Sequence, residues 1–484
     1  MYFWAKPKRK MRQKLVNFSD FANSLYVHEA EYLCSIQKFE KEENIRILNL
    51  ILYNCKNPLN TLPYDVTIDK RTYSYIKNWI TQSLQKIDVD VFYEWLISIE
   101  KQVLTDSIEP ENEKLILDKI EIIKPSHYYF IRFFELILHY RDYLIVRNRK
   151  KFYYPVSQYI NQHNQIYGER GALNARLNTV TEHIMQQDKS FTLDYLQMEE
   201  FLKLLYFDTE IDGYTRYRAV IRLTLLYYNT RDFSKLQNIY DHLDNAFRSE
   251  SFYSKRILAN YYANRAMMHS KLNELVMAQK YAYLSIRQKN NDYLFYLVNL
   301  IGVLLKSQKN KEALSLMNQS INELKNTNSF YNKIGFVVFY MKSLKANNLI
   351  SNAINYGSNY FEAYKKDIFQ HRWHLFMSTY IQLLLSDEQY QRIISLSKRY
   401  GLINKEKQII GKAGYLPVIY WHTLVAEYME CIISIEKLEE NMLKSALEEI
   451  SHSYKSQKIK ELLANLSEYI PSVIKNINQK IKNA

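Results

Sequence analysis

One short segment carries residue types that bind metal ions. His371 and His374, in "HRWH", are one helical turn apart, so both imidazoles have the spacing to bind one metal ion. The nearest carboxylates, Asp367 and Glu362, are not placed to complete a ligand set. Packing around Trp373 is the better interpretation, and the sequence predicts no metal and no cofactor.

The segment "DVD" (88–90) brings two carboxylates together in the sequence. A pair of acids can do general acid–base chemistry, but no companion acid or glycine-rich loop accompanies this one. We therefore interpret the segment as the start of the helix "VFYEWLISI" (91–99).

Arg132 and His139, in "RFFELILH", are spaced R-x6-H. This spacing resembles the motif of HEPN-type helical ribonucleases, in which the arginine and histidine of two protomers meet to cleave RNA. That family prefers a polar residue directly after the arginine, where this chain has Phe133. A second copy runs from Arg176 to His183, again with an apolar residue in that place. Because GxxxxGK[ST], HExxH, GxSxG and GxGxxG are also absent, the sequence predicts a protein that is not an enzyme, with a HEPN-like ribonuclease as the third hypothesis.

Two basic segments suggest contact with an acidic partner. The chain has 65 Lys and Arg against 51 Asp and Glu, a net charge of +14. "KPKRKMRQK" (6–14) lies near the start, and "RNRKKFYY" (147–154) places cations beside aromatic rings that can stack on bases. The other interpretation is a basic terminus and a solvated helix end. The candidate nucleic-acid contacts are Lys8, Arg9, Lys10, Arg147, Arg149 and Lys150.

The scarcity of glycine and proline indicates the fold class. The 484 residues include 9 glycines and 8 prolines, with no proline between Pro155 and Pro417. Both residues punctuate turns and strands, so long stretches without them favour helices joined by short polar loops. The 43 tyrosines would favour strands, but the apolar segments 218–228 and 293–305 have helical length and no period-two alternation. The sequence predicts an all-α protein.

Three regions are expected along the chain. Residues 1–165 form an N-terminal helical domain with proline-marked breaks at 57–63, 108–112 and 123–127, and the polar stretch 161–171 is a boundary. Residues 172–415 are more regular, and 401–417 interrupt the pattern. Residues 416–484 form a C-terminal cap, in which "IPSVIKNINQKIKN" (470–483) covers the last hairpin or docks on a membrane or partner.

One seven-residue turn pattern recurs in the middle region. Its copies are "TRDFSKL" (230–236), "LNELVMA" (272–278), "SQKNKEA" (307–313), "NNLISNA" (347–353) and "DEQYQRI" (387–393). The spacing suits a helix, a tight turn and a second helix closed by a small or apolar anchor, and it resembles the tetratricopeptide repeat (TPR). The family's proline at the repeat end is missing, so armadillo-like or untyped repeats remain open. The resemblance implies a right-handed superhelical array of helical hairpins.

Such an array exposes a concave face lined by the first helix of each hairpin. In the TPR family this face commonly holds an extended peptide. The leading hypothesis is a non-enzymatic scaffold or regulator that binds a protein or peptide partner there, and the alternative is a nucleic-acid-associated subunit. The residues predicted on that face are Arg218, Arg222, Asn260, Asn264, Asn299, Lys342 and Gln382.

The remaining features point to a reducing compartment. Cys34, Cys55 and Cys431 are odd in number and form no CxxC pair. No apolar segment follows the basic start, and the longest apolar run, 293–305, is too short to span a bilayer. We expect a soluble, cytoplasmic protein without a secretory signal or transmembrane segment; oligomeric state is left open.

Overall fold

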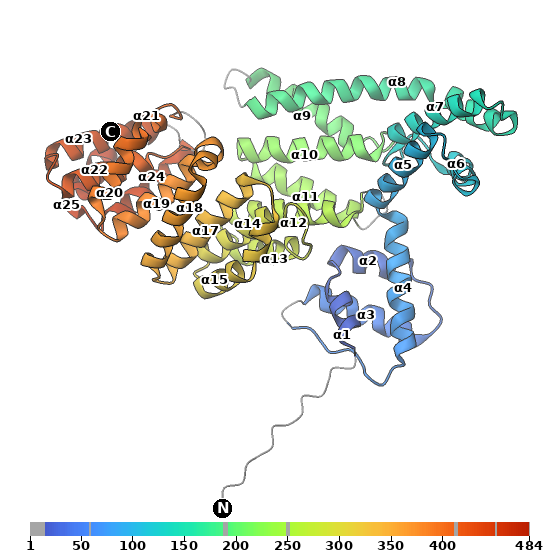
Figure 1. The fold of residues 1–484 in the computed structure, drawn as a ribbon, viewed down its shortest axis with the longest axis horizontal. Helices are drawn as coiled ribbons and strands as arrows, with labels where there is room; N and C mark the ends of the chain where they lie inside the picture. Colours follow the sequence, from blue (N-terminus) through green and yellow to red (C-terminus); the bar gives the residue numbers. More distant parts are fainter. Residues whose placement is uncertain are drawn as a thin grey trace, which may run out of the picture. The chain divides into compact units, whose positions relative to one another are not determined.

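The computed structural model describes residues 15–57, 60–186, 192–247, 252–410, 415–450 and 453–483, and within these ranges it contains helices and no strands (Figure 1). This confirms the predicted all-α class. The chain divides into two compact units, residues 1–288 and 289–484, each with its own hydrophobic core. The three-region division stays a prediction, although the polar stretch 161–171 is continuous helix rather than a break.

The first helices of unit 1 end where the sequence has its prolines. Residues 60–63 and 123–127 lie between two helices, as predicted, and a helix begins at Pro110 within 108–112, because proline is tolerated in the first turn of a helix but not in its interior. The first four helices pack on one another, and α5 packs on α7. The helices are α1 (Val16–Asn23), α2 (Val27–Ile36), α3 (Glu42–Lys56), α4 (Lys70–Ile87), α5 (Val89–Leu104) and α6 (Pro110–Ile122).

The rest of unit 1 is a series of antiparallel helix pairs. The helix α8 is long and polar, and it contacts α6, α7 and α10. The helix α12 packs on α13, in which Ala278 and Ala282 are fully buried, and such small side chains let two helices approach closely. These helices are α7 (Phe130–Val146), α8 (Lys150–Gln186), α9 (Thr192–Phe207), α10 (Gly213–Thr230), α11 (Phe233–Phe247), α12 (Lys255–Lys271) and α13 (Leu275–Ser285).

One kind of turn closes most of the hairpins. Eight non-glycine residues of the described part have positive φ, and each is followed by a backbone N–H that donates to the carbonyl five residues earlier. This is the Schellman arrangement that ends a helix with a left-handed residue. The eight residues are Asp106, Asn148, Arg231, Asn273, Gln308, Asn348, Glu388 and Cys431.

In six of these turns the next helix begins two residues after the left-handed residue. Five of the six are the turns predicted from the sequence. The anchor is the last residue of each predicted copy, and all five are fully buried: Leu236, Ala278, Ala313, Ala353 and Ile393. The sixth joins α7 to α8 at Asn148, inside the segment "RNRKKFYY" that was predicted to contact nucleic acid. That basic segment is therefore a hairpin turn of the same kind as the others.

Unit 2 is built from further hairpins. The buried Trp421 and the apolar residues around it form its core. Its helices are α14 (Tyr293–Lys306), α15 (Asn310–Gln319), α16 (Ile321–Asn326), α17 (Phe330–Ala346), α18 (Ile350–His371), α19 (Trp373–Ser386), α20 (Tyr390–Tyr400), α21 (Leu402–Lys407), α22 (Val418–Met429), α23 (Ile435–Ile450), α24 (Ser453–Leu466) and α25 (Pro471–Asn483).

Successive hairpins of unit 2 stack through their first helices. The helix α17 contacts its own partner α18 and also α14 and α19, the first helices of the hairpins before and after it. The helix α19 contacts α22 in the same way. At the C-terminus, α25 packs on α23 and α24 and buries Val473, Ile474 and Ile477. The prediction that this amphipathic helix covers apolar surface of the same protein is thus confirmed.

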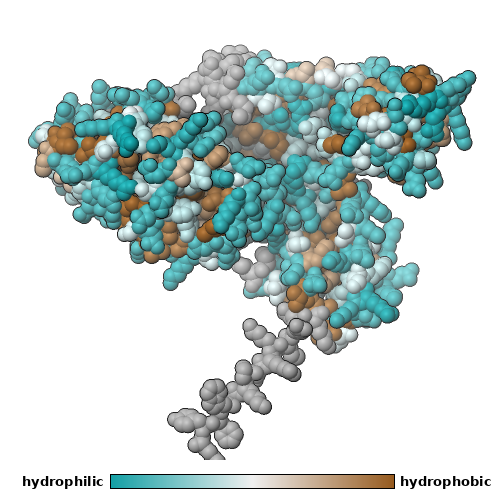
Figure 2. All heavy atoms as spheres, viewed as in Figure 1, coloured by the Kyte–Doolittle hydropathy of each residue, from teal (hydrophilic) through white to brown (hydrophobic). Residues whose placement is uncertain are grey.

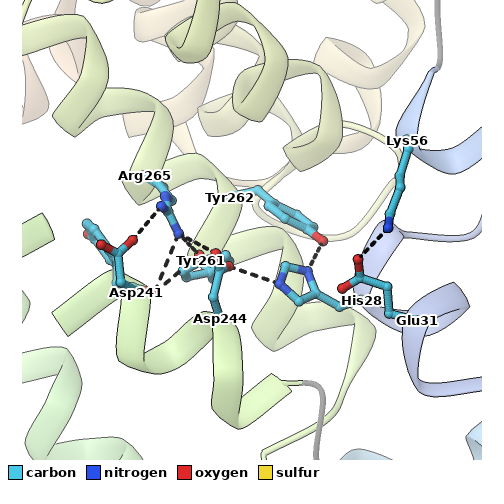
Figure 3. Close-up of polar contacts among 9 residues, drawn as sticks. His28, Glu31, Lys56, Asp241, Asp244, Tyr261, Tyr262 and Arg265 are labelled. Carbon is cyan, nitrogen blue, oxygen red and sulfur yellow. Dashed lines mark hydrogen bonds and ion pairs between the residues drawn. The ribbon is translucent and has the colours of Figure 1, made fainter. Parts of the chain in front are cut away.

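A buried polar network ties α2 to α11 and α12 within unit 1 (Figure 3). His28 lies between Tyr262 Oη (2.6 Å) and Asp244 Oδ1 (2.9 Å). Arg265, which is 7% exposed, forms ion pairs with Asp241 (2.8 Å) and Asp244 (2.9 Å). The two His28 contacts join residues more than 200 positions apart, so α2 belongs to the same core as α12.

The surface shown in Figure 2 is mostly hydrophilic, with hydrophobic residues in small separate groups. Among the described residues, no helix combines the length and the hydropathy that a bilayer crossing requires.

Candidate functional site: a cleft lined by arginines and tyrosines

A cleft of about 730 Å³ in unit 1 brings together residues from four helices. The helical period explains why α5, α10 and α12 each contribute residues three or four positions apart. Its lining residues are Asp90, Tyr93 and Glu94 of α5; Tyr128 and Tyr129 before α7; Arg132 of α7; Tyr214, Tyr217, Arg218, Ile221 and Arg222 of α10; and Arg256 and Asn260 of α12. Three residues predicted on the concave face, Arg218, Arg222 and Asn260, therefore share this cleft.

Stacked tyrosines form one wall. The ring of Tyr129 stacks on Tyr93 with centroids 4.9 Å apart and lies 5.6 Å from the ring of Tyr214. Burial raises the pKa of Tyr128 and Tyr129, so both phenols stay protonated at neutral pH. The Tyr128 hydroxyl has no hydrogen-bond partner among the described residues. The wall thus offers aromatic faces and at least one unused phenol.

A glycine allows the segment before α7 to reach this wall. The backbone N–H of Tyr214 donates to the Tyr128 carbonyl at 2.9 Å. A Cβ atom on Gly213 would lie 2.7 Å from the Tyr128 ring, closer than atoms in contact can lie, and 3.1 Å from the Tyr128 Cα. Asp212 caps α10 by accepting from the Thr215 N–H, so the N-terminus of α10 is fixed against Tyr128.

Two of the four cleft arginines are neutralised by carboxylates. Arg256 donates to both oxygens of Asp90, at 2.7 and 3.0 Å, and this pairing raises the pKa of the guanidinium. Arg132 pairs with Glu135 at 2.5 Å and with Glu100 at 3.2 Å. These pairs fix α5 against α12 and against α7.

Arg218 and Arg222 have neutral partners instead. Arg218 donates to the side-chain oxygens of Asn174 and Asn178, each at 2.5 Å, and Arg222 donates to Thr181 Oγ1 at 2.7 Å. All three acceptors lie on α8, four and three residues apart, so one face of α8 supports both guanidinium groups. Burial and the neighbouring Arg218 lower the pKa of Arg222.

The other residues predicted on the concave face lie elsewhere. Asn264 is one turn beyond Asn260 on α12 and donates to its side-chain oxygen at 2.9 Å. Asn299, Lys342 and Gln382 lie in unit 2, on α14, α17 and α19. Burial lowers the pKa of Lys342.

The predicted nucleic-acid contacts that the structure describes are largely engaged. Arg147 pairs with Asp106 at 2.8 Å, and Arg149 pairs with the buried Glu113. The Arg147 guanidinium also lies over the ring of Tyr143, 4.4 Å from its centroid. The Arg149 guanidinium lies over the ring of Phe152 in the same hairpin. Lys150 starts α8 and is exposed, while Lys8, Arg9 and Lys10 lie outside the described residues.

The candidate catalytic and metal-binding pairs take part in packing. His139 lies 3.3 Å from Glu100, which also holds Arg132, and Arg176 lies over the ring of Phe201 at 4.1 Å.

His371 and His374 are on different helices, because the backbone of Arg372 separates α18 from α19; the single helical turn assumed from the sequence is wrong. His374 instead pairs with Glu406 at 2.8 Å. The described residues contain no group of three metal-ligating side chains. Asp88 accepts from the Asp90 N–H as the N-cap of α5, which confirms that "DVD" starts a helix.

A scan of protein-family models and a search of curated proteins find no match to this chain.

Proposed function

We propose that this chain is a helical-hairpin interaction protein whose cleft in unit 1 binds a protein or peptide partner. The cleft itself carries this proposal: four helices converge to present stacked tyrosines beside arginines. Aromatic residues and arginine contribute most of the binding energy at protein interfaces. Within this proposal, the protein acts as a scaffold or regulator and is not an enzyme.

The finer architecture belongs to the same proposal. Six turns of one length and the contacts between the first helices of successive hairpins in unit 2 support a TPR-like, right-handed superhelical array. The three cysteines, all free, are in keeping with a reducing compartment such as the cytoplasm.

Nucleic-acid binding is the weaker hypothesis. A nucleic-acid groove needs a track of cations that are free to neutralise phosphates. Arg147 and Arg149 are instead paired with Asp106, which follows α5, and Glu113 of α6. The cleft also contains the exposed Glu94, which would repel a phosphate backbone.

Site-specific photo-crosslinking tests the proposal. The photoreactive residue p-benzoylphenylalanine replaces Tyr214, which lines the cleft, or Leu225, which lies on the same helix outside it; both positions are 40% exposed. In the native host, we expect one defined protein adduct at position 214, absent at 225 and unaffected by nuclease. Equal adducts at both positions, or loss of the adduct on nuclease treatment, would contradict it.

A further inference from the structure

The unneutralised part of the cleft is the pair formed by Arg218 and Arg222. These residues are one helical turn apart on α10, and both line the cleft. Two like charges at this spacing repel each other, and burial removes part of the water that would screen them. The pair therefore raises the energy of the empty protein unless something negative is bound there.

The supporting helix preserves this positive charge. The α8 side chains that hold the pair are Asn174, Asn178 and Thr181, which orient the guanidinium groups without neutralising them. Among the described residues, no carboxylate lies within ion-pair distance of either group. Elsewhere in the cleft, by contrast, Asp90 neutralises Arg256. Side chains that served packing alone could include an acid on α8, which would remove the repulsion.

We propose that Arg218 and Arg222 bind a carboxylate of an acidic peptide segment. This inference rests on the proposed partner-binding function and names the chemistry of the partner. Guanidinium groups hold carboxylates through short charge-assisted hydrogen bonds. The unneutralised positive charge is confined to these two arginines, and Glu94 lies in the same cleft. The site therefore suits one acidic group better than a run of phosphates. The Tyr128 hydroxyl, in a side chain only 5% exposed, is an unused donor in the same cleft.

The first test compares thermal unfolding in sodium succinate and in sodium chloride at equal ionic strength. At about 50 mM succinate we expect the melting temperature of the native sequence to rise by roughly 2 °C. Arg218→Gln and Arg222→Gln should abolish the rise, because each removes one of the two guanidinium groups. Arg141→Gln is the matched control, since Arg141 lies outside the cleft and pairs with Asp142. An equal rise in all four proteins would overturn the assignment, as would a rise with phosphate but none with succinate.

The second test uses fluorescein-labelled peptides. We expect (Glu-Gly)5 amide to bind about tenfold more tightly than (Gln-Gly)5 amide at physiological salt, and Arg222→Gln to remove the difference. A preference for (Gln-Gly)5 with a free C-terminal carboxylate would assign the site to a chain terminus instead of a side chain. Equal affinity of all three peptides would overturn the peptide assignment.

The two proposals fail in different ways. If position 214 captures a partner while the succinate effect is the same in Arg222→Gln, the partner-binding function stands and the carboxylate site is wrong. If the succinate effect requires both arginines but crosslinking is equal at 214 and 225, the anion site stands and the partner proposal is wrong.

Discussion

At the scale of single residues, the stability of unit 1 depends on a few buried charges. Asp244 accepts from His28 and pairs with Arg265, and these partners, together with Tyr261, hold its pKa at about 2, below the ordinary 3.8. A carboxylate with a lowered pKa stabilises the folded state above its unfolded pKa and loses that contribution as pH falls. The network therefore acts at every pH above about 4.

Asp244→Asn should lower the free energy of unfolding of unit 1 by about 2–4 kcal/mol, because Arg265 would keep its buried charge with one partner fewer. Urea unfolding followed by circular dichroism measures this. Asp142→Asn is the control: its carboxylate is 62% exposed and pairs with Arg141, so we expect a change below about 0.5 kcal/mol. A loss for Asp244→Asn as small as the control's would show that the network contributes little.

His422, in unit 2, is buried and makes stability depend on pH. Burial lowers its pKa from 6.5 to about 4, and the ring bonds to the Val418 carbonyl at 2.7 Å. The unfolded chain thus takes up a proton first as pH falls. The contribution of neutral His422 to the free energy of unfolding is fully present above about pH 6.5. It declines by about 3 kcal/mol as the pH falls toward about 4. His422→Gln should flatten the slope of unfolding free energy between these pH values; an unchanged slope would assign it to other groups.

At the scale of elements, the hairpin turns place side chains in a conformation that disfavours them. A non-glycine residue at positive φ costs roughly 1 kcal/mol, and six turns of one length carry this cost. These turns are nevertheless stable, because the helix that follows each turn buries an apolar anchor such as Ala313 or Ala353. The packing of the hairpin, more than the turn residue, determines where the chain reverses.

Gln308→Gly should therefore raise the free energy of unfolding of unit 2 by about 0.5–1 kcal/mol, because glycine adopts positive φ without strain. The exposed Lys311 in α15 gives the matched control, where Lys311→Gly should cost about 1 kcal/mol. Denaturant titration of both variants measures the difference. A loss of stability in Gln308→Gly would mean that the side chain contributes more than the strain it causes.

At the scale of the whole molecule, two units with separate cores should respond separately to core substitutions. Trp421 is fully buried in unit 2, and Phe133 is fully buried in unit 1. Trp421→Ala should cost about 3–5 kcal/mol and increase amide exchange in residues 289–484 only. Phe133→Ala should do the same in residues 1–288. Hydrogen exchange read by mass spectrometry distinguishes these outcomes, and faster exchange in both units for either variant would show one cooperative molecule.

Local signals in the sequence were enough to predict the helical class and the five turns whose last residues are buried. These features depend on residues close in the chain, where scarce glycine and proline and helical spacing are sufficient signals. The hairpin register put seven residues on one concave face, and of these Arg218, Arg222 and Asn260 share the cleft while Asn264, Asn299, Lys342 and Gln382 do not line it.

Which of the cleft arginines are paired with a carboxylate depends on contacts between residues far apart in the sequence. Asp90 neutralises Arg256 across 166 positions, and Asn174 reaches Arg218 across 44, so no local pattern distinguishes the two arginines. The same holds for Arg149 in the α7–α8 turn, whose partner Glu113 lies 36 residues earlier in the chain. Tyr93 and Tyr129 were missed as cleft residues for the same reason, although the helical spacing of Tyr214 with Arg218 would have indicated the face that α10 presents. Charge and exposure at a site depend on neighbours that folding brings together, and sequence spacing records only neighbours along the chain.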